Sequence, residues 1–165
     1  MTETKTNFLR PHRNPYFKAN LRLWSDTEPL ASVVRASPRR WKTVDVKGET
    51  IPARGRVTAR IAQQHYASSE DEKYENIEDV AQVLSQWLDE IENDAPPIKA
   101  LAESGKINAV LWVAIFGHDE IATPALPAEL DTRAKQAGVK ILLENYTIMD
   151  EKTGNPVKGF YGATD

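Results

Sequence analysis

The amino-acid sequence predicts an α+β fold, a twisted and largely antiparallel sheet with helices mainly on one face. Residues 107–116 (INAVLWVAIF) form a nearly uncharged run in which even and odd positions are both apolar, as is typical of a strand buried on two faces. Residues 77–91 repeat apolar side chains at helical spacing and predict an amphipathic helix. Strand and helix patterns are mixed along the chain, with at least one direct step from strand to strand.

The first predicted strand covers residues 16–25, where apolar side chains occupy every second position. Trp24 falls on the polar side of this strand. A helix follows, capped by Asp26 or Thr27 and ended before Pro38, because the residue before a proline disfavours the helical conformation. The chain therefore begins with a strand that has one polar face.

Two further strands are expected in the first half of the chain, at residues 41–46 and 56–66. Glycine and proline mark a loop over residues 48–55 between them. The second of these strands has three inward-facing apolar residues, Val57, Ala59 and Ile61. Residues 68–75 (SSEDEKYE) are strongly charged and predict a solvated linker.

The longest predicted helix begins after Asn76, a favourable capping residue. Its apolar stripe consists of Ile77, Val80, Ala81, Leu84, Trp87, Leu88 and Ile91. Pro96 and Pro97 end this helix, and a short helix at residues 98–104 is followed by Gly105, which suits a left-handed position.

The last part of the chain predicts a helix at residues 128–137, a glycine at 138, and a strand at residues 139–148. The element order is then β-α-β-β-α-β-α-β. This order is related to the split βαβ or ferredoxin-like arrangement, in which the strand after the long helix lies inside the sheet.

The length of 165 residues is typical of one domain, so we expect a single domain over residues 1–165. Its predicted parts are a flexible arm at 1–15, the α+β core at 16–148 and a tail at 149–165.

Composition limits the classes of protein. The absence of cysteine excludes disulfides and thiolate zinc sites, and the start of the chain has no apolar signal segment. The run at 107–116 is too short to span a membrane. We therefore expect a cytoplasmic protein without a membrane segment.

Residues 1–64 hold 13 Lys and Arg against 5 Asp and Glu, whereas the whole chain has a net charge of −3, so the two halves differ strongly in charge.

Three stretches together resemble an uncharacterised bacterial family, domain-of-unknown-function family 4279. They are residues 17–37 (FKANLRLWSDTEPLASVVRAS), 38–52 (PRRWKTVDVKGETIP) and 124–146 (PALPAELDTRAKQAGVKILLENY). The resemblance implies a bacterial protein with this fold, and it implies no activity for any residue.

One basic and aromatic group of residues is a candidate ligand site near the strand ends, formed by Trp24, Arg39, Arg40, Trp41 and His118. Arginine suits phosphate and carboxylate groups, and tryptophan can stack on a ring. Nucleic acid is not expected as a partner, because Asp45 and Glu49 interrupt the basic residues and the pI is about 5.7.

We expect neither a metal nor a cofactor. His118 is followed directly by Asp119 and Glu120, and adjacent loop residues do not converge on an ion as the two histidines of HExxH do.

The function that follows is a non-catalytic binding or immunity-type interaction domain with an unknown protein partner. Candidate interaction residues are the acidic Glu75, Glu78 and Asp79, and the aromatic Trp112 and Phe116. The alternative is a small-ligand or hydrolytic site around the arginine and tryptophan residues. A homodimer that uses Trp112, Phe116 or Tyr146 is a third hypothesis.

Overall fold

The described chain forms one large sheet with helices on one side of it and a separate two-stranded hairpin. The computed structural model describes residues 15–53, 55, 58–94, 96–117 and 124–148. The strands of the large sheet are β1 (Tyr16–Ser25), β2 (Trp41–Asp45), β5 (His65–Ser69), β6 (Glu72–Tyr74), β7 (Asn108–Gly117) and β8 (Lys140–Thr147). Their order is β2-β5-β1-β7-β8, with β6 also paired to β1.

All neighbouring strands of this sheet are antiparallel except β7 and β8, which are parallel. The prediction of an α+β fold with a largely antiparallel sheet is therefore confirmed. Strand β7 lies between β1 and β8, so the prediction that residues 107–116 form an interior strand is also confirmed.

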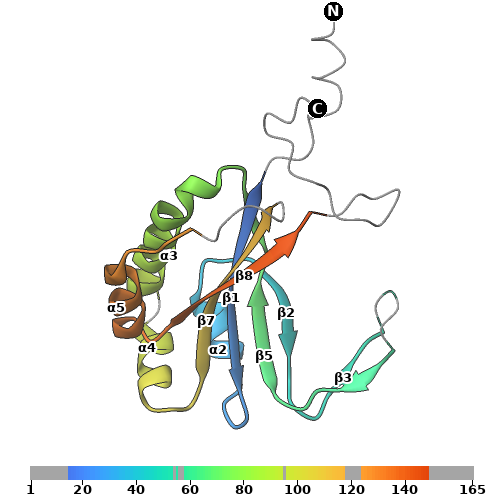
Figure 1. The fold of residues 1–165 in the computed structure, drawn as a ribbon. Helices are drawn as coiled ribbons and strands as arrows, with labels where there is room; N and C mark the ends of the chain where they lie inside the picture. Colours follow the sequence, from blue (N-terminus) through green and yellow to red (C-terminus); the bar gives the residue numbers. More distant parts are fainter. Residues whose placement is uncertain (1–14, 54, 56–57, 95, 118–123, 149–165) are drawn as a thin grey trace, which may run out of the picture.

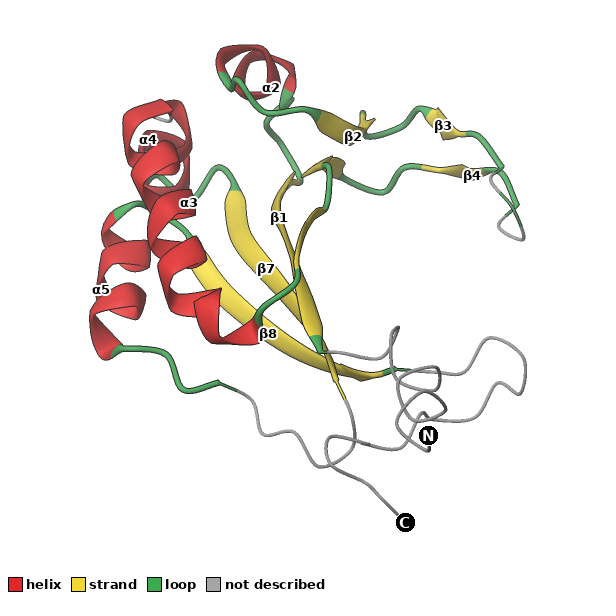
Figure 2. Ribbon diagram, turned by 90° about the horizontal axis from the view of Figure 1, so that it is seen from above, coloured by secondary structure: helices red, strands yellow, loops and turns green. Residues whose placement is uncertain are grey.

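The helices are α2 (Ala31–Ala36), α3 (Val80–Asp94), α4 (Pro96–Glu103) and α5 (Ala128–Gln136), with a 3-10 turn, η1, at Ile77–Asp79. Helices α3, α4 and α5 cover one face of the sheet (Figures 1 and 2). The carboxamide oxygen of Asn76 accepts the backbone N–H of Glu78 at 3.0 Å, which confirms the predicted cap. The main core lies between these helices and the sheet.

This core is built from alternate strand positions and one helical stripe. Phe17, Leu21 and Leu23 of β1 are fully buried, as are Leu111 and Val113 of β7. The stripe of α3 that packs against them consists of Val80, Val83, Leu84, Trp87, Leu88 and Ile91. Because successive side chains of a strand point to opposite faces, the other residues of β1 and β7 face away from the helices.

The expected strand at residues 56–66 and the expected linker at 68–75 are wrong. The chain instead forms β4 (Arg60–Ile61), which pairs with β3 (Thr50–Ile51) in a separate hairpin, and then β5 and β6, which follow one edge of β1. Ile61 is half exposed rather than inward. The alternation of apolar residues did not predict β5, because this strand buries small polar residues: Ser68 and Ser69 are both buried.

Ser69 shows why a polar residue can be buried in this strand. Its hydroxyl oxygen accepts the backbone N–H of Leu21 at 2.9 Å, close to the interruption between β5 and β6. The side chain thus supplies an acceptor where the strand ladder is broken, and a buried N–H group stays satisfied.

The first helix is also shorter than predicted, and neither Asp26 nor Thr27 caps it. Helix α2 begins after Leu30 without a side-chain cap. The hydroxyl of Ser25 instead accepts the N–H groups of Thr27 and Glu28 at 3.2 and 2.8 Å and so stabilises the turn before the helix.

Candidate functional site: an aromatic face covered by cationic side chains

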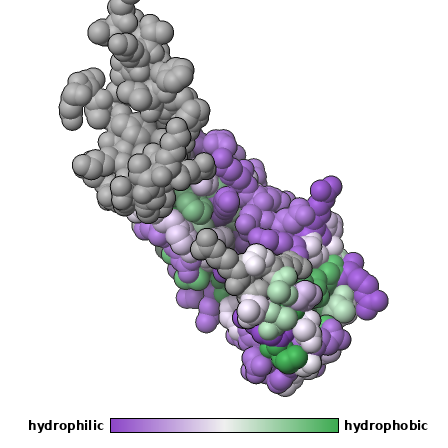
Figure 3. Space-filling model, turned by 90° about the vertical axis from the view of Figure 1, so that its right-hand side faces the viewer, coloured by the Kyte–Doolittle hydropathy of each residue, from purple (hydrophilic) through white to green (hydrophobic). Residues whose placement is uncertain are grey.

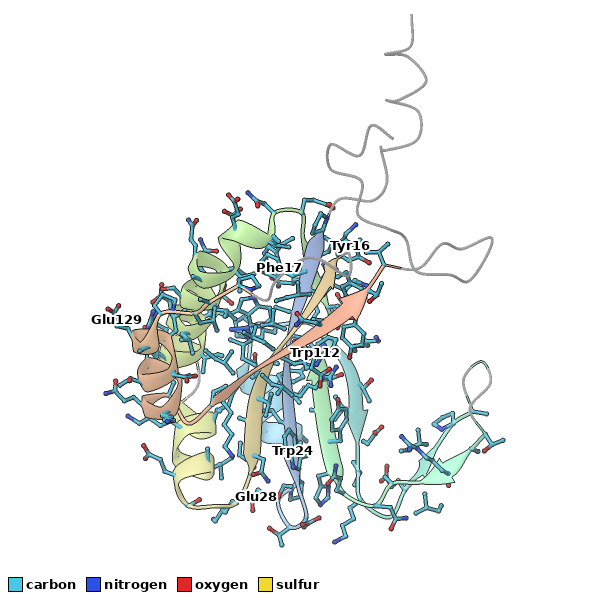
Figure 4. The ribbon with its side chains drawn as sticks, viewed as in Figure 1. Tyr16, Phe17, Trp24, Glu28, Trp112 and Glu129 are labelled. Carbon is cyan, nitrogen blue, oxygen red and sulfur yellow. The ribbon has the colours of Figure 1, made fainter. Side chains whose placement is uncertain are left out.

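The sheet face turned away from the helices carries a second, smaller hydrophobic cluster. Val110, Trp112 and Ala114 of β7 are buried in it, and Trp24 and Phe116 pack against them. Tyr16 and Phe17 are neighbours at the start of β1 that lie on opposite faces, so Tyr16 belongs to this second face (Figure 4). We call it the open face, formed by Tyr16, Lys18, Asn20, Arg22 and Trp24 of β1, Lys73 of β6, Val110, Trp112, Ala114 and Phe116 of β7, and Lys140, Leu142, Glu144 and Tyr146 of β8.

Three aromatic rings cross the open face side by side. Tyr16, Phe116 and Tyr146 are register partners on β1, β7 and β8. Their ring centres are 4.8 Å and 5.2 Å apart, and the ring planes differ by 9° and 20°. These distances match the spacing between neighbouring strands, so the rings stack on one another. The Phe116 ring is therefore flanked by the two tyrosines.

Cationic side chains lie over the rings of this face. The guanidinium carbon of Arg22 is 3.9 Å from the centre of the Trp112 ring. The ammonium groups of Lys73 and Lys18 lie 4.5 Å from Tyr16 and 5.6 Å from Phe116, respectively. Such contacts combine cation–π attraction with burial of the aliphatic stems. They contribute to the low exposure of Trp112, 9%, on a face that none of the helices in the described part of the chain covers.

Glu144 of β8 joins two aromatic side chains of the open face. Its carboxylate accepts the indole N–H of Trp112 at 2.9 Å and the hydroxyl of Tyr146 at 2.6 Å. These bonds, the one from Tyr146 first, lower the pKa of Glu144, with a smaller contribution from Arg22. The same bond raises the pKa of Tyr146, because the phenol donates to an anion. The carboxylate is therefore held as an anion among the rings.

A polar chain continues from Arg22 toward β6. Its Nε donates to the carboxamide oxygen of Asn20 at 3.2 Å, and the Asn20 amide donates to a carboxylate oxygen of Asp71 at 2.5 Å. Asn20 is buried, and these bonds satisfy it there. The Arg22 guanidinium is thus held by two contacts: it lies on the Trp112 ring and donates to the Asn20 carboxamide.

Two apolar side chains of the open face remain exposed, and both belong to the edge strand β8. Leu142 is 45% exposed and Tyr146 is 42% exposed. The other exposed large apolar residues of the described chain are Val44, Val46 and Ile61, near the β3–β4 hairpin. Figure 3, which views the molecule from the hairpin side, shows hydrophobic surface set among hydrophilic residues in its lower part.

The hairpin side has its own hollow, with a volume of about 670 Å³. It is lined by both apolar and charged residues, among them Val44, Val46 and Ile61 beside Asp45 and Arg60. No single charge or residue type dominates its walls, so its chemistry is less specific than that of the open face.

The structure separates the residues of the candidate ligand site. Trp24 packs on the open face, whereas Trp41 packs against the core on the helix side. Arg39 lies over the ring of Trp87, 4.5 Å from its centre, and pairs with Glu90 at 2.9 Å. His118 lies outside the described residues. Trp24 and Arg39 are therefore on opposite sides of the sheet and do not form one site.

Arg39 and Arg40 do line a hollow of their own, with a volume of about 480 Å³. Its other walls are Pro38, Ser69, Glu70, Asp71, Glu72, Trp87 and Glu90. On one wall the indole N–H of Trp87 donates to the hydroxyl of Tyr74 at 3.0 Å, and that hydroxyl donates to Glu72 at 2.5 Å. Carboxylates outnumber arginines in this hollow, four to two.

The candidate interaction residues are also divided. Glu75, Glu78 and Asp79 are exposed at the start of the long helix, and Glu75 pairs with Lys73 at 3.2 Å. Trp112 is nearly buried on the open face, and Phe116 is partly buried there. Leu142 was not among the candidates, although the alternation of the last strand, with Ile141 and Leu143 inward, already directs residue 142 outward.

The described residues include no group of three or more His, Asp or Glu side chains placed to hold a metal ion. His65 is buried, and its Nδ1 accepts the backbone N–H of Lys47 at 3.2 Å. Among the helices of the described chain, none is both long enough and apolar enough to cross a membrane.

The chain was compared with protein-family models, with curated proteins and with solved structures, and none of the three comparisons finds a match.

Proposed function

We propose that this chain is a non-catalytic protein-binding domain whose contact surface is the open face of β1, β7 and β8. The observation that carries the proposal is the stacked aromatic row with its cationic cover, bordered by the exposed Leu142 and Tyr146. Aromatic and arginine side chains are enriched in protein interfaces, and a surface already held in one conformation loses little entropy on binding.

The proposal extends to the fold. The strand order β2-β5-β1-β7, with every neighbour antiparallel, supports a ferredoxin-like split βαβ unit to which α5 and β8 add a parallel strand. In this arrangement one face of the sheet is left without helices. The resemblance to family 4279 remains part of this proposal and rests on the three sequence stretches.

Selection of peptides from a random display library tests the proposed surface. Selected peptides should bind the wild-type chain and lose most of their affinity for Leu142→Asp. The matched control is Val44→Asp, because Val44 has the same exposure, 45%, and lies on β2 at the opposite edge of the sheet. Equal loss in both variants, or loss in neither, contradicts the proposal.

An immunity-type surface on the long helix predicts a different result. Glu78 and Asp79 are exposed at its start. If Glu78→Lys abolishes binding of the selected peptides and Leu142→Asp does not, the contact surface is the acidic helix and the open face is excluded.

The second candidate is a small-ligand site in the hollow lined by Arg39 and Arg40, favoured by its volume of about 480 Å³ and by Trp87 in its wall. A screen of small charged compounds by thermal shift tests it. A true ligand raises the melting temperature of the wild type and not that of Arg40→Gln.

A further inference from the structure

We infer that the open face binds an acidic protein segment that also carries apolar side chains. This inference rests on the proposed function and names the chemistry of the partner. It depends on which charges of the open face already have a protein partner and which do not.

The carboxylates on and beside the open face are already engaged. Glu144 accepts two hydrogen bonds from Trp112 and Tyr146. Asp71 accepts the amide of Asn20 and lies 3.9 Å from the ammonium of Lys42. Among the described residues, Asp45 also lies on this side of the sheet by register, but at the far edge on β2.

The cations of the open face are less completely paired. Arg22 uses its Nε for Asn20, and within the described part of the chain its two terminal nitrogens have no hydrogen-bond partner. Lys18 contacts a ring, not a carboxylate. Lys140 is the register partner of Val110 and is exposed on the same face as Arg22. Arg22 also acts on the Glu144 carboxylate through its charge, whereas Lys18 and Lys140 form no ion pair within the described part of the chain. The positive charge of these two lysines is therefore available to complement carboxylates of a partner.

The arrangement of the rings favours a protein segment over a nucleic acid. Base recognition needs ring faces that are free to stack. Here Phe116 lies between two tyrosines, Lys73 covers Tyr16, and Arg22 covers Trp112.

Leu142 and Tyr146 supply apolar contact area, which the cations lack. Both side chains are exposed at the β8 side of the face, beside the positive charges. Exposed charge pairs alone contribute little to affinity, so a partner needs apolar side chains as well as carboxylates. An acidic segment with interspersed apolar residues satisfies both requirements.

Fluorescence anisotropy tests the inference with three labelled probes. They are a peptide of alternating Glu and Leu, a peptide of equal length with Lys in place of Glu, and an oligothymidylate. We expect the Glu–Leu peptide to bind most tightly. Lys18→Gln and Lys140→Gln should each weaken its binding roughly threefold to fivefold, as for an exposed ion pair, and Arg22→Gln should do so at least as strongly.

Lys99→Gln is the matched control, because it removes the same charge from an exposed position on α4, on the helix side. It should leave the affinity unchanged. Since Arg22→Gln also uncovers Trp112, Lys18→Gln and Lys140→Gln decide the result if that variant is poorly folded.

Several outcomes overturn the inference. If the Lys–Leu peptide binds more tightly and Leu142→Asp abolishes that binding, the inference fails while the proposed function stands. If the oligothymidylate binds more tightly and Leu142→Asp abolishes that binding, the face binds nucleic acid, and both the inference and the proposed protein-binding function fail. If light scattering shows a dimer that Leu142→Asp dissociates, the occupant is a second copy of this chain. If the Glu–Leu peptide does not bind and the display-selected peptides ignore Leu142→Asp, both the inference and the proposed function fail.

Discussion

The guanidinium of Arg22 lies 3.9 Å from the ring centre of Trp112 on the neighbouring strand. It covers part of a sheet face on which, among the described residues, no helix packs. The side chains of β1 thus bury the second apolar face of β7, which on sequence grounds required a cover. An arginine is suited to this role because its guanidinium stays hydrated at one surface while the other lies on the indole.

Arg22→Ala should therefore expose Trp112. We expect a loss of stability of about 1 to 2 kcal/mol and a red shift of tryptophan emission, since the indole gains contact with water. Urea unfolding followed by fluorescence measures both effects. Arg35→Ala, at an exposed position on α2, is the control and should change neither. Identical behaviour of the two variants would show that Arg22 does not cover the ring.

Glu144 should make the stability of the protein depend on pH in the acid range. The pKa of Glu144 is lowered in the folded state, so the unfolded chain binds its proton first as the pH falls below the ordinary value of 4.5. The stabilisation is complete above 4.5 and is lost as the pH falls through the lowered value. Glu144→Gln should be less stable than the wild type at pH 7, and the difference should shrink in acid. A difference that is independent of pH contradicts this assignment.

Tyr146→Phe tests whether the hydrogen bond from Tyr146 causes the lowered pKa of Glu144. The Tyr146 hydroxyl is the main donor that lowers the pKa of Glu144. Removing it should raise that pKa toward its ordinary value, and NMR of the Glu144 side-chain carboxyl carbon follows the titration. If the titration does not move, the bond from Tyr146 is not the cause of the shift.

Tyr74 accepts the indole N–H of Trp87 at 3.0 Å, and Trp87 is only 3% exposed. Tyr74→Phe leaves this buried donor without an acceptor, which should cost about 1 to 3 kcal/mol of stability. Urea unfolding at neutral pH measures the loss. Tyr16→Phe, which alters a tyrosine of the open face, is the comparison and should cost less.

Tyr74 also predicts a loss of stability in alkali. Burial, together with the bond to Glu72, raises the pKa of Tyr74 well above its ordinary value of 10.0. Above pH 10 the unfolded chain loses this proton while the folded chain keeps it, so stability falls as the pH rises. Tyr74→Phe should lack this part of the slope. An absorbance titration of tyrosinate in both proteins shows whether the late-ionising group is Tyr74.

Gly138 and Gly48 form a matched pair of turn glycines with φ of +77° and +87°. A Cβ at Gly138 would lie 3.0 Å from the Cβ of Ala102 and 3.2 Å from the Cα of Lys99, whereas a Cβ at Gly48 meets nothing within 4 Å. Gly48→Ala should cost about 1 to 2 kcal/mol for the left-handed backbone alone. Gly138→Ala should cost more, because α4 must also shift. Thermal unfolding of both variants measures the difference, and equal melting temperatures would contradict it.

Local patterns predicted several elements correctly. The helical spacing of Leu84, Leu88 and Ile91 and the cap at Asn76 identified the long helix, because both signals act within a few residues of one another. Strand β5 was missed because burial of Ser68 and Ser69 depends on partners far along the chain, such as Leu21.

For the candidate site, the sequence alone identified Trp112, Phe116 and Tyr146 as candidate contact residues and placed Trp24 in a different candidate site. It identified neither the cations that lie over these rings nor Leu142. It determined that residues 107–116 form an interior strand with two apolar faces and that helices cover one of them, because these properties follow from the periods of strands and helices. Only the tertiary structure decided that Arg22, Lys18 and Lys73 cover the other face and that Leu142 and Tyr146 stay exposed. The physical reason is that cross-strand register chooses which cation lies over which ring, and register arises only when distant segments pair.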